Sequence, residues 1–164
     1  MSLAYGEQTT LSWRKRRAGQ RLMIGFEGSA PSAEFRALVR EVCPAGFILF
    51  ARNVEEPAQV LELSRELASL LPDTHPPLLG VDQEGGRVQR IRATEWPRAR
   101  WVGNVDDPRR TAALAGAMSD ELLAMGFDVN FAPVCDVDSN PKNPVIGDRS
   151  FGRDPKAAAR HVVA

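Results

Sequence analysis

Asp82 is the residue whose type and position point most clearly to chemistry, because its carboxylate lies at a turn that a ligand can approach closely. It follows a run of uncharged residues, and Gly85 and Gly86 after it let the backbone approach a ligand without side-chain obstruction. A carboxylate there can accept two hydrogen bonds from the hydroxyls of a polyol, each contributing roughly 1.5–3 kcal/mol in a partly dry pocket. The alternative is an ion pair between Asp82 and Arg87 or Arg149, which would make Asp82 a structural residue.

Arginines in two segments can supply hydrogen-bond donors to the same ligand. Arg149 carries a planar donor fork suited to hydroxyl or amide oxygens, and two prolines in its loop limit the entropy lost when a ligand is gripped. Asp148 is adjacent and can orient Arg149. Arg87 and Arg90 lie three residues apart and either reach the ligand or brace the loop.

The glycine pair after Asp82 is a weak signal for a phosphate-binding loop. No Lys-Ser or Lys-Thr follows it, and the sequence has no G-x-G-x-x-G pattern after its first apolar run. These absences disfavour a free-standing doubly wound nucleotide-binding domain.

Continuous apolar runs alternate with amphipathic helical patterns along the chain. Runs without polar alternation are typical of parallel strands that are covered on both faces, so the sequence predicts a parallel α/β sheet. Four strand-helix units are half of a TIM-type (β/α)8 barrel of about 250 residues. Strands are expected at residues 21–26, 46–50, 77–81 and 127–137. Helices are expected to begin at Pro31, Glu56-Pro57, Asp107-Pro108 and Asp154-Pro155, with a leader or first helix over residues 1–19 and a long loop over 88–106.

Polar side chains follow each expected strand. Because parallel strands point their carboxyl ends the same way, these residues should gather on one rim of the sheet, where they either bind a ligand or form ordinary salt bridges and caps. They are Glu27, Arg52, Asn53, Asp82, Gln83, Glu84, Asp136, Asp138, Asp148 and Arg149.

Composition limits the kinds of partner. The chain has 164 residues, and its 21 basic and 21 acidic residues cancel to a net charge of zero. This balance gives no long-range field to attract nucleic acid or anionic lipid, so a small neutral partner fits better. The basic run Arg14–Arg17 has no interleaved aromatic residue beyond Trp13, and we interpret it as a solvated leader.

The sequence also disfavours membrane, secreted and metal-binding classes. No apolar stretch approaches the roughly 20 residues that span a bilayer, and no signal-peptide core follows the basic run, so we expect no membrane contact and a cytoplasmic location. Cys43 and Cys135 lack metal-ligand spacing and are expected to be buried reduced thiols. His75 and His161 have no Cys or His partner at ligand spacing, so we expect neither a metal nor a cofactor.

Two long motifs give the chain a family resemblance. Val-Asp-Gln-Glu-Gly-Gly-Arg-Val-Gln-Arg at 81–90 and the segment 130–152, supported by 46–53, resemble the bacterial β-N-acetylhexosaminidases of glycoside hydrolase family three. The similarity runs from about Gly19 to the last residue. Ile-Gly-Asp-Arg-Ser-Phe at 146–151 favours the hexosaminidase branch over the β-glucosidases of the same family.

The resemblance implies a (β/α)8 barrel of which residues 1–164 are the N-terminal half of a single catalytic domain. It implies a retaining, exo-acting enzyme that removes terminal N-acetyl-β-glucosamine from peptidoglycan-derived muropeptides during cytoplasmic cell-wall recycling. By the matching motifs, Asp82, Arg90 and Arg149 correspond to residues that bind the N-acetylglucosamine-containing saccharide. Arg87, Asp136 and Asp148 are expected to support them.

The same resemblance places the family's catalytic residues outside this sequence. The nucleophilic Asp and the acid/base His are expected beyond Ala164, because no Lys-His-Phe-Pro-Gly-His-Gly-like segment occurs before it. The 164-residue segment alone is therefore predicted to be inactive, as part of a longer enzyme shortened by cloning, proteolysis or gene annotation. A non-catalytic saccharide-binding half-domain and another family three β-glycosidase, such as a β-glucosidase, remain as alternatives. A half-barrel existing alone has open strand edges through which it can self-associate.

Overall fold

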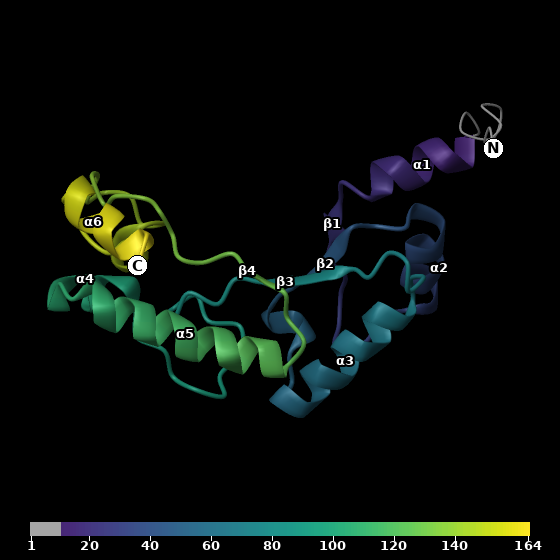
Figure 1. The fold of residues 1–164 in the computed structure, drawn as a ribbon, viewed down its shortest axis with the longest axis horizontal. Helices are drawn as coiled ribbons and strands as arrows, with labels where there is room; N and C mark the ends of the chain where they lie inside the picture. The colour runs from purple at the N-terminus through teal and green to yellow at the C-terminus, as the bar shows by residue number, and fades with distance from the viewer. Residues whose placement is uncertain (1–10) are drawn as a thin grey trace, which may run out of the picture.

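The computed structural model describes residues 11–164, which form a crescent around a central four-stranded sheet (Figure 1). All strands are parallel and follow the chain order, as the sequence predicted. The longest pairing joins the second and third strands over four residues. The strands are β1 (Met23–Ile24), β2 (Gly46–Leu49), β3 (Leu78–Val81) and β4 (Val129–Asn130).

Helices cover one side of the sheet and build the two arms of the crescent (Figure 1). The helices are α1 (Leu11–Gly19), α2 (Ala33–Val42), α3 (Pro57–Ser69), α4 (Ala99–Val105), α5 (Pro108–Ala124) and α6 (Pro155–Val162), with 3-10 turns η2 (Ala51–Asn53) and η3 (Gly147–Arg149). Side chains of Asp107 and Asp154 cap α5 and α6 by accepting from backbone N–H groups, and a proline follows each cap. These helix starts are confirmed, whereas α2 begins after Ser32, whose hydroxyl accepts from Phe35 N.

The main core lies between the sheet and the helices α2 and α3. Phe47 and Leu49 of β2 are fully buried, as is Val81 of β3, and Leu79 of β3 is nearly so. The ring of Phe47 lies 6.1 Å from that of Phe35 on α2. Burial on this side accounts for the apolar residues at alternate positions of β2 and β3. The runs are continuous because the residues between them, on the opposite face, are uncharged as well.

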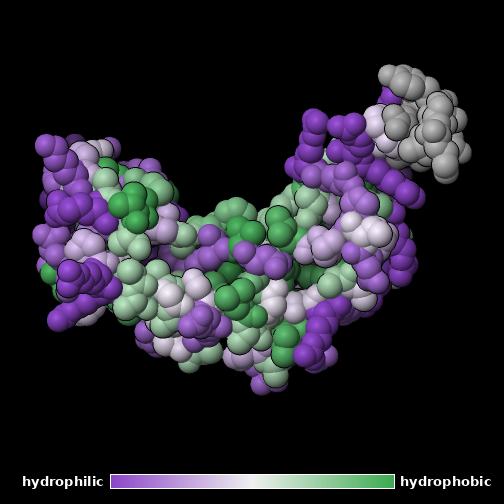
Figure 2. Space-filling view, in the orientation of Figure 1, coloured by the Kyte–Doolittle hydropathy of each residue, from purple (hydrophilic) through white to green (hydrophobic). Residues whose placement is uncertain are grey.

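The opposite face of the sheet is apolar and open. Strand alternation places Ile48 and Gly80 on this face. A Cβ atom on Gly80 would lie 2.8 Å from the Phe131 ring and 3.1 Å from Met23 Sδ, so these two side chains close over the glycine. Phe131 is nevertheless 48% exposed. Figure 2 shows apolar residues gathered in the hollow of the crescent, between arms that are largely hydrophilic.

Two predicted boundaries are wrong. The fourth strand was expected over 127–137 but forms a ladder only at β4, with a last bond from Phe131 N to Val81 O. Its partner β3 ends there, and Pro133 has no N–H to continue the ladder. The segment 88–106 is not wholly a loop, because α4 lies within it and packs Val102 against Phe151.

The thiols also differ from expectation. Cys43 is half-buried, because it ends α2 in the left-handed conformation at the edge of the core, and Cys135 is exposed in the segment after β4. Within residues 11–164, no group of three metal-ligating side chains meets, and no helix is long and apolar enough to cross a membrane. The expected first helix is present as α1, while residues 1–10 lie outside the described part of the chain.

Asn53 joins the ends of the first two strands at the predicted rim. Its side chain is fully buried, and Nδ2 donates to the carbonyl oxygens of Phe26 at 3.0 Å and Gly28 at 2.7 Å. Its Oδ1 accepts from Phe50 N at 2.9 Å. One amide therefore satisfies backbone groups from two strand exits.

Replacing Asn53 by alanine should lower the free energy of unfolding by about 2–3 kcal/mol, because buried backbone groups lose their partners. Chemical denaturation measures this change. Asn104→Ala is the matched control, because Asn104 is exposed in α4, and it should leave stability nearly unchanged. Equal effects of the two substitutions would contradict the role given to Asn53.

The face of the sheet opposite the main core is apolar and exposed. We therefore predict that the 164-residue chain associates with other copies of itself when it is prepared alone. Besides Phe131, Leu78 on the same face is 47% exposed, and Leu22, which precedes β1, is 48% exposed. Apolar surface and unpaired strand edges favour pairing with another copy. Sedimentation velocity should show dimers or larger species, and a stable monomer would contradict this prediction.

Candidate functional site

Gln83 locks the turn that carries Asp82 and Arg90. Its Oε1 accepts from the backbone N–H groups of Arg90 at 2.9 Å and Ile91 at 3.1 Å, and its Nε2 donates to Ile91 O at 2.7 Å. Its backbone exchanges two hydrogen bonds with the Asn130 side chain on β4, each 3.0 Å long. Gln83 is fully buried, so the turn after β3 is fixed to the neighbouring strand.

Asp82 pairs with Arg90. Arg90 Nη2 lies 3.1 Å from Asp82 Oδ2, and each side chain is 26% exposed. Neither pair considered from the sequence, with Arg87 or with Arg149, forms. Arg90 also lies over the Phe50 ring at 5.8 Å, and its Nε is buried without a hydrogen-bond partner in the described part of the chain. Asp82 Oδ1 accepts no hydrogen bond among residues 11–164, and both side chains remain partly exposed at the rim.

Glu84 grips Arg149 in a two-bond ion pair. Arg149 Nε donates to Oε2 at 2.8 Å and Nη2 donates to Oε1 at 2.6 Å. The Glu84 side chain is only 7% exposed. These bonds raise the pKa of Arg149, and the nearby carboxylates of Asp136 and Asp82 add to the increase. Asp82 and Arg149 thus lie at the same end of the sheet.

Asp148 does not orient Arg149, contrary to the expectation from their adjacency. It pairs instead with Arg87 at 3.0 Å and with Arg98 at 3.6 Å. Arg87 Nη2 also donates to the carbonyls of Pro144 at 3.1 Å and Ile146 at 3.2 Å, and to Val145 O. The sequence left two roles open for Arg87, contact with the ligand and bracing of the loop, and in the structure Arg87 braces the loop.

Asp138 anchors the same loop from its other side. Its side chain is 7% exposed and accepts from Arg100 at 2.9 Å and from Arg153 at 3.2 Å. Arg100 continues to Gly147 O at 3.1 Å and Ser150 O at 3.3 Å. The guanidinium groups of Arg153 and Arg100 hold the pKa of Asp138 below its usual range.

Asp136 makes no side-chain ion pair in the part of the chain that the structure describes. It is exposed, and its backbone carbonyl accepts from Ser150 Oγ at 2.7 Å. Its carboxylate is close enough to Arg149 to favour the charged form of that residue. Its contribution is therefore a local negative charge beside the rim.

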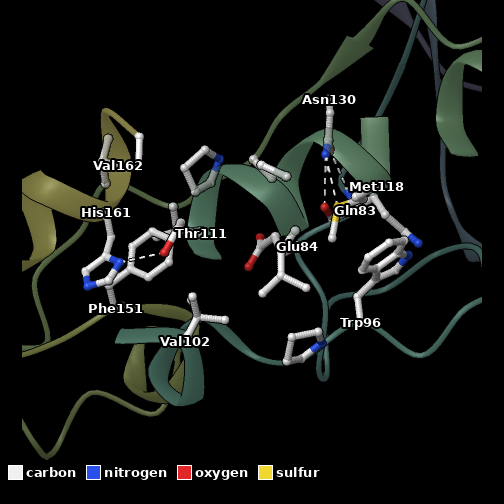
Figure 3. A pocket seen from close by; sticks show the side chains of 18 of the residues that line it. Gln83, Glu84, Trp96, Val102, Thr111, Met118, Asn130, Phe151, His161 and Val162 are labelled. Atoms are coloured by element: carbon white, nitrogen blue, oxygen red, sulfur yellow. Dashed lines mark hydrogen bonds between the residues drawn. The ribbon is translucent and has the colours of Figure 1, made fainter. Parts of the chain in front are cut away.

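The Glu84–Arg149 pair forms part of the wall of a cavity of about 350 Å³. Figure 3 shows other side chains that line it, from Trp96 to His161. Its wall is mainly apolar and includes Val102, Leu114, Met118 and Phe151. Its polar groups largely satisfy one another: Thr111 Oγ1 lies 2.7 Å from His161 Nδ1, and Gln83 bonds to Asn130. Asp82 and Arg90 do not line it. The cavity is thus a mainly apolar space that meets the rim at Glu84 and Arg149, whereas Asp82 and Arg90 lie outside it.

The Asp138 anchor predicts how stability depends on pH. A carboxyl group whose pKa is lowered by folding stabilises the folded state above its unfolded pKa of about 3.9, and this stabilisation disappears as the pH falls through the folded pKa. The difference in unfolding free energy between the wild type and Asp138→Asn should therefore shrink between about pH 6 and about pH 2. Denaturation at several pH values measures it.

Asp73→Asn is the control for this series, because Asp73 is exposed in the turn after α3. Its stability difference from the wild type should stay nearly constant across the same range. A difference for Asp138→Asn that is equally flat would exclude the anchor.

Comparisons with known proteins identify the family. The model of the glycosyl hydrolase family 3 N-terminal domain matches residues 15–164. A beta-hexosaminidase of Pseudomonas aeruginosa is 41% identical over 141 residues, which cover 84% of this chain and 41% of that protein. One from Methylococcus capsulatus is 44% identical over 146 residues, covering 84% of this chain and 42% of its own length. The chain thus spans less than half of these curated relatives.

Solved structures agree with the fold. The family 3 β-N-acetylglucosaminidase of Paenibacillus sp. str. FPU-7 superposes with a TM-score of 0.85 at 39% identity, over 93% of this chain and 29% of that one. NagZ from Neisseria gonorrhoeae in complex with N-trifluoroacetyl-D-glucosamine has a TM-score of 0.80 at 31% identity, over 88% of this chain and 45% of that one. The predicted fold, the first part of a TIM-type barrel, is confirmed. Sequence and fold agree across nearly the whole described chain, which therefore belongs to glycosyl hydrolase family 3.

Proposed function

We propose that this chain is the saccharide-binding part of a retaining, exo-acting β-N-acetylhexosaminidase that releases terminal N-acetyl-β-glucosamine. The observation that carries the proposal is the meeting of Asp82, Arg90 and Arg149 at one end of the sheet, in the motifs that resemble the family's sugar-binding segments. Relatives named beta-hexosaminidase and the Neisseria complex with a glucosamine derivative support the substrate class.

The rim offers both kinds of hydrogen-bonding group that a hexose needs. Asp82 Oδ1 has no hydrogen-bond partner among residues 11–164 and can accept from a hydroxyl. Glu84 and Val145 engage one N–H on each nitrogen of the Arg149 guanidinium, so the second N–H on each terminal nitrogen remains for a ligand. These groups suit a hydroxyl or the acetamido oxygen.

Supporting roles go to the residues that hold the loop. Arg87 and Asp148 fix the segment before Arg149, and Asp136 adds a negative charge beside it. None of the three needs to touch the sugar in this arrangement.

Glu84 is unsuited to be one of the two catalytic carboxyl groups of a retaining glycosidase. Both of its oxygens accept hydrogen bonds from Arg149, and its side chain is only 7% exposed, so neither oxygen is free to reach the reacting sugar. As the family resemblance implies, the proposal keeps the nucleophilic Asp and the acid/base His outside this sequence, and the 164-residue chain alone should bind a saccharide without hydrolysing it.

Activity on aryl glycosides tests the proposal against its alternatives. The full-length gene product should hydrolyse an aryl N-acetyl-β-glucosaminide with retention of configuration and leave an aryl β-glucoside nearly untouched. Preference for the glucoside would favour a β-glucosidase, and binding without turnover would favour a non-catalytic saccharide-binding module. Release of N-acetylglucosamine from muropeptides, together with fractionation of cells, tests the expected cytoplasmic role in cell-wall recycling.

Arg149→Ala should lower kcat/KM of the full-length protein by at least about ten-fold, which corresponds to about 1.4 kcal/mol of transition-state binding. The physical reason is the loss of directional N–H donors at the rim. Steady-state kinetics on the aryl N-acetyl-β-glucosaminide measures the effect.

Arg109→Ala is the matched control, because Arg109 is exposed on α5. Its kinetics should equal those of the wild type. Unaltered kinetics for Arg149→Ala, in a protein that is still folded, would remove Arg149 from the site.

A further inference from the structure

We infer that Glu84 is a positioning residue that sets the orientation of the Arg149 guanidinium and cancels its charge, so that the rim accepts a neutral sugar in preference to an anion. The inference deepens the proposed function and rests on its assignment of Arg149 to the saccharide. Glu84 acts through Arg149 and does not itself need to contact the ligand.

Arg149 requires such a partner because its own loop, although its backbone is braced, gives the guanidinium only one long hydrogen bond, from Nη1 to Val145 O at 3.3 Å. It ends the short turn η3, and its backbone N–H donates to Ile146 O at 3.0 Å. Val145 nearby is 57% exposed. An arginine side chain has several rotatable bonds, so only a contact at the guanidinium can select one orientation of its donor fork.

Glu84 is rigid enough to make that selection. Its backbone N–H donates to Val88 O at 2.9 Å, and its side chain is 7% exposed. Gly85 and Gly86 follow with positive φ angles of 88° and 57°, which glycine adopts without strain. A Cβ atom on Gly85 would lie 2.4 Å from Pro97 O, so the turn packs directly on the next segment. The backbone that carries the Glu84 side chain is therefore fixed before and after the glycine pair.

The two bonds from Arg149 to Glu84 use one edge of the guanidinium. The remaining N–H groups on the terminal nitrogens must then lie in the plane that Glu84 defines. A ligand oxygen at the rim meets donors whose direction was fixed before binding. This arrangement reduces the ordering cost of association.

The pairing of charges at the rim determines which class of ligand can bind favourably there. Glu84 compensates Arg149, Asp82 compensates Arg90, and Asp136 adds a further negative charge close to Arg149. The rim therefore offers directional N–H groups without a net positive field. Such a site suits hydroxyl and amide oxygens, whereas a phosphate would meet neighbouring carboxylates without an unpaired cation.

A double-mutant cycle tests whether Glu84 acts through Arg149. In the full-length protein, Glu84→Gln and Arg149→Gln should each weaken N-acetylglucosamine binding by about ten-fold or more, as measured by titration calorimetry. If Glu84 works by positioning Arg149, the double variant should bind within about two-fold of Arg149→Gln. Losses that multiply to about a hundred-fold would overturn the inference, because Glu84 would then act independently.

Proton exchange at Arg149 tests the positioning without any saccharide. The Arg149 Nε–H signal, assigned by its absence in Arg149→Gln, should exchange at least about ten-fold faster in Glu84→Gln than in the wild type. Glu62→Gln is the control, since Glu62 makes an exposed ion pair with Arg65 and should leave this signal unchanged. An unchanged rate in Glu84→Gln would overturn the positioning role. Faster exchange with unaltered sugar binding in Arg149→Gln would keep the positioning but refute the proposed saccharide contact.

Inorganic phosphate tests the charge compensation. Glu84→Gln should bind phosphate at least about ten-fold more tightly than the wild type, and this gain should vanish in the double variant. Glu84→Asp keeps the charge on a shorter side chain, so it should lose sugar affinity and Nε–H protection without gaining phosphate affinity. This variant also gives a second readout if Glu84→Gln does not fold. The charge role would be wrong if phosphate binding did not increase in Glu84→Gln.

Discussion

The ion pair between Glu84 and Arg149 is the contact on which the arrangement of the rim depends. It joins the end of β3 to a loop 65 residues later in the chain. Taking both charges out of water is costly, and the two short hydrogen bonds offset that cost only while both partners are present. The pair therefore ties the loop position to the strand exit.

Two further ion pairs fix the position of the loop that carries Arg149. Arg87, in the turn that also holds Glu84, pairs with Asp148 and donates to the carbonyls before it. Arg100 from α4 pairs with Asp138 and reaches the carbonyl of Gly147. Apart from one 3-10 turn, the loop has no regular structure. Side-chain contacts from two directions replace the backbone ladder that would otherwise fix it.

The sequence predicted those features that depend on neighbouring residues. Apolar runs located β2 and β3, and Asp-Pro pairs located the starts of α5 and α6. It missed α4, because seven residues show too little helical period, and it overextended β4, whose length depends on where β3 ends. Asp82 and Arg149 were placed at one end of the sheet by the direction rule for parallel strands. The partner of Arg149 was missed, because adjacency in sequence suggested Asp148, whereas the two side chains reach different partners.

Because the arginines at the rim are paired with carboxylates, the affinity for a ligand depends on hydrogen bonds and not on long-range charge attraction. A rim of unpaired cations attracts ligands over a distance and tolerates imprecise placement, because the field falls off slowly. A rim of compensated pairs, such as Asp82 with Arg90, offers only hydrogen bonds whose strength depends steeply on distance and angle. Recognition of a neutral hexose then depends on the accuracy with which the loop and turn are held. The buried network of Gln83 beneath the rim supplies that accuracy without facing the ligand, since its side chain is fully buried.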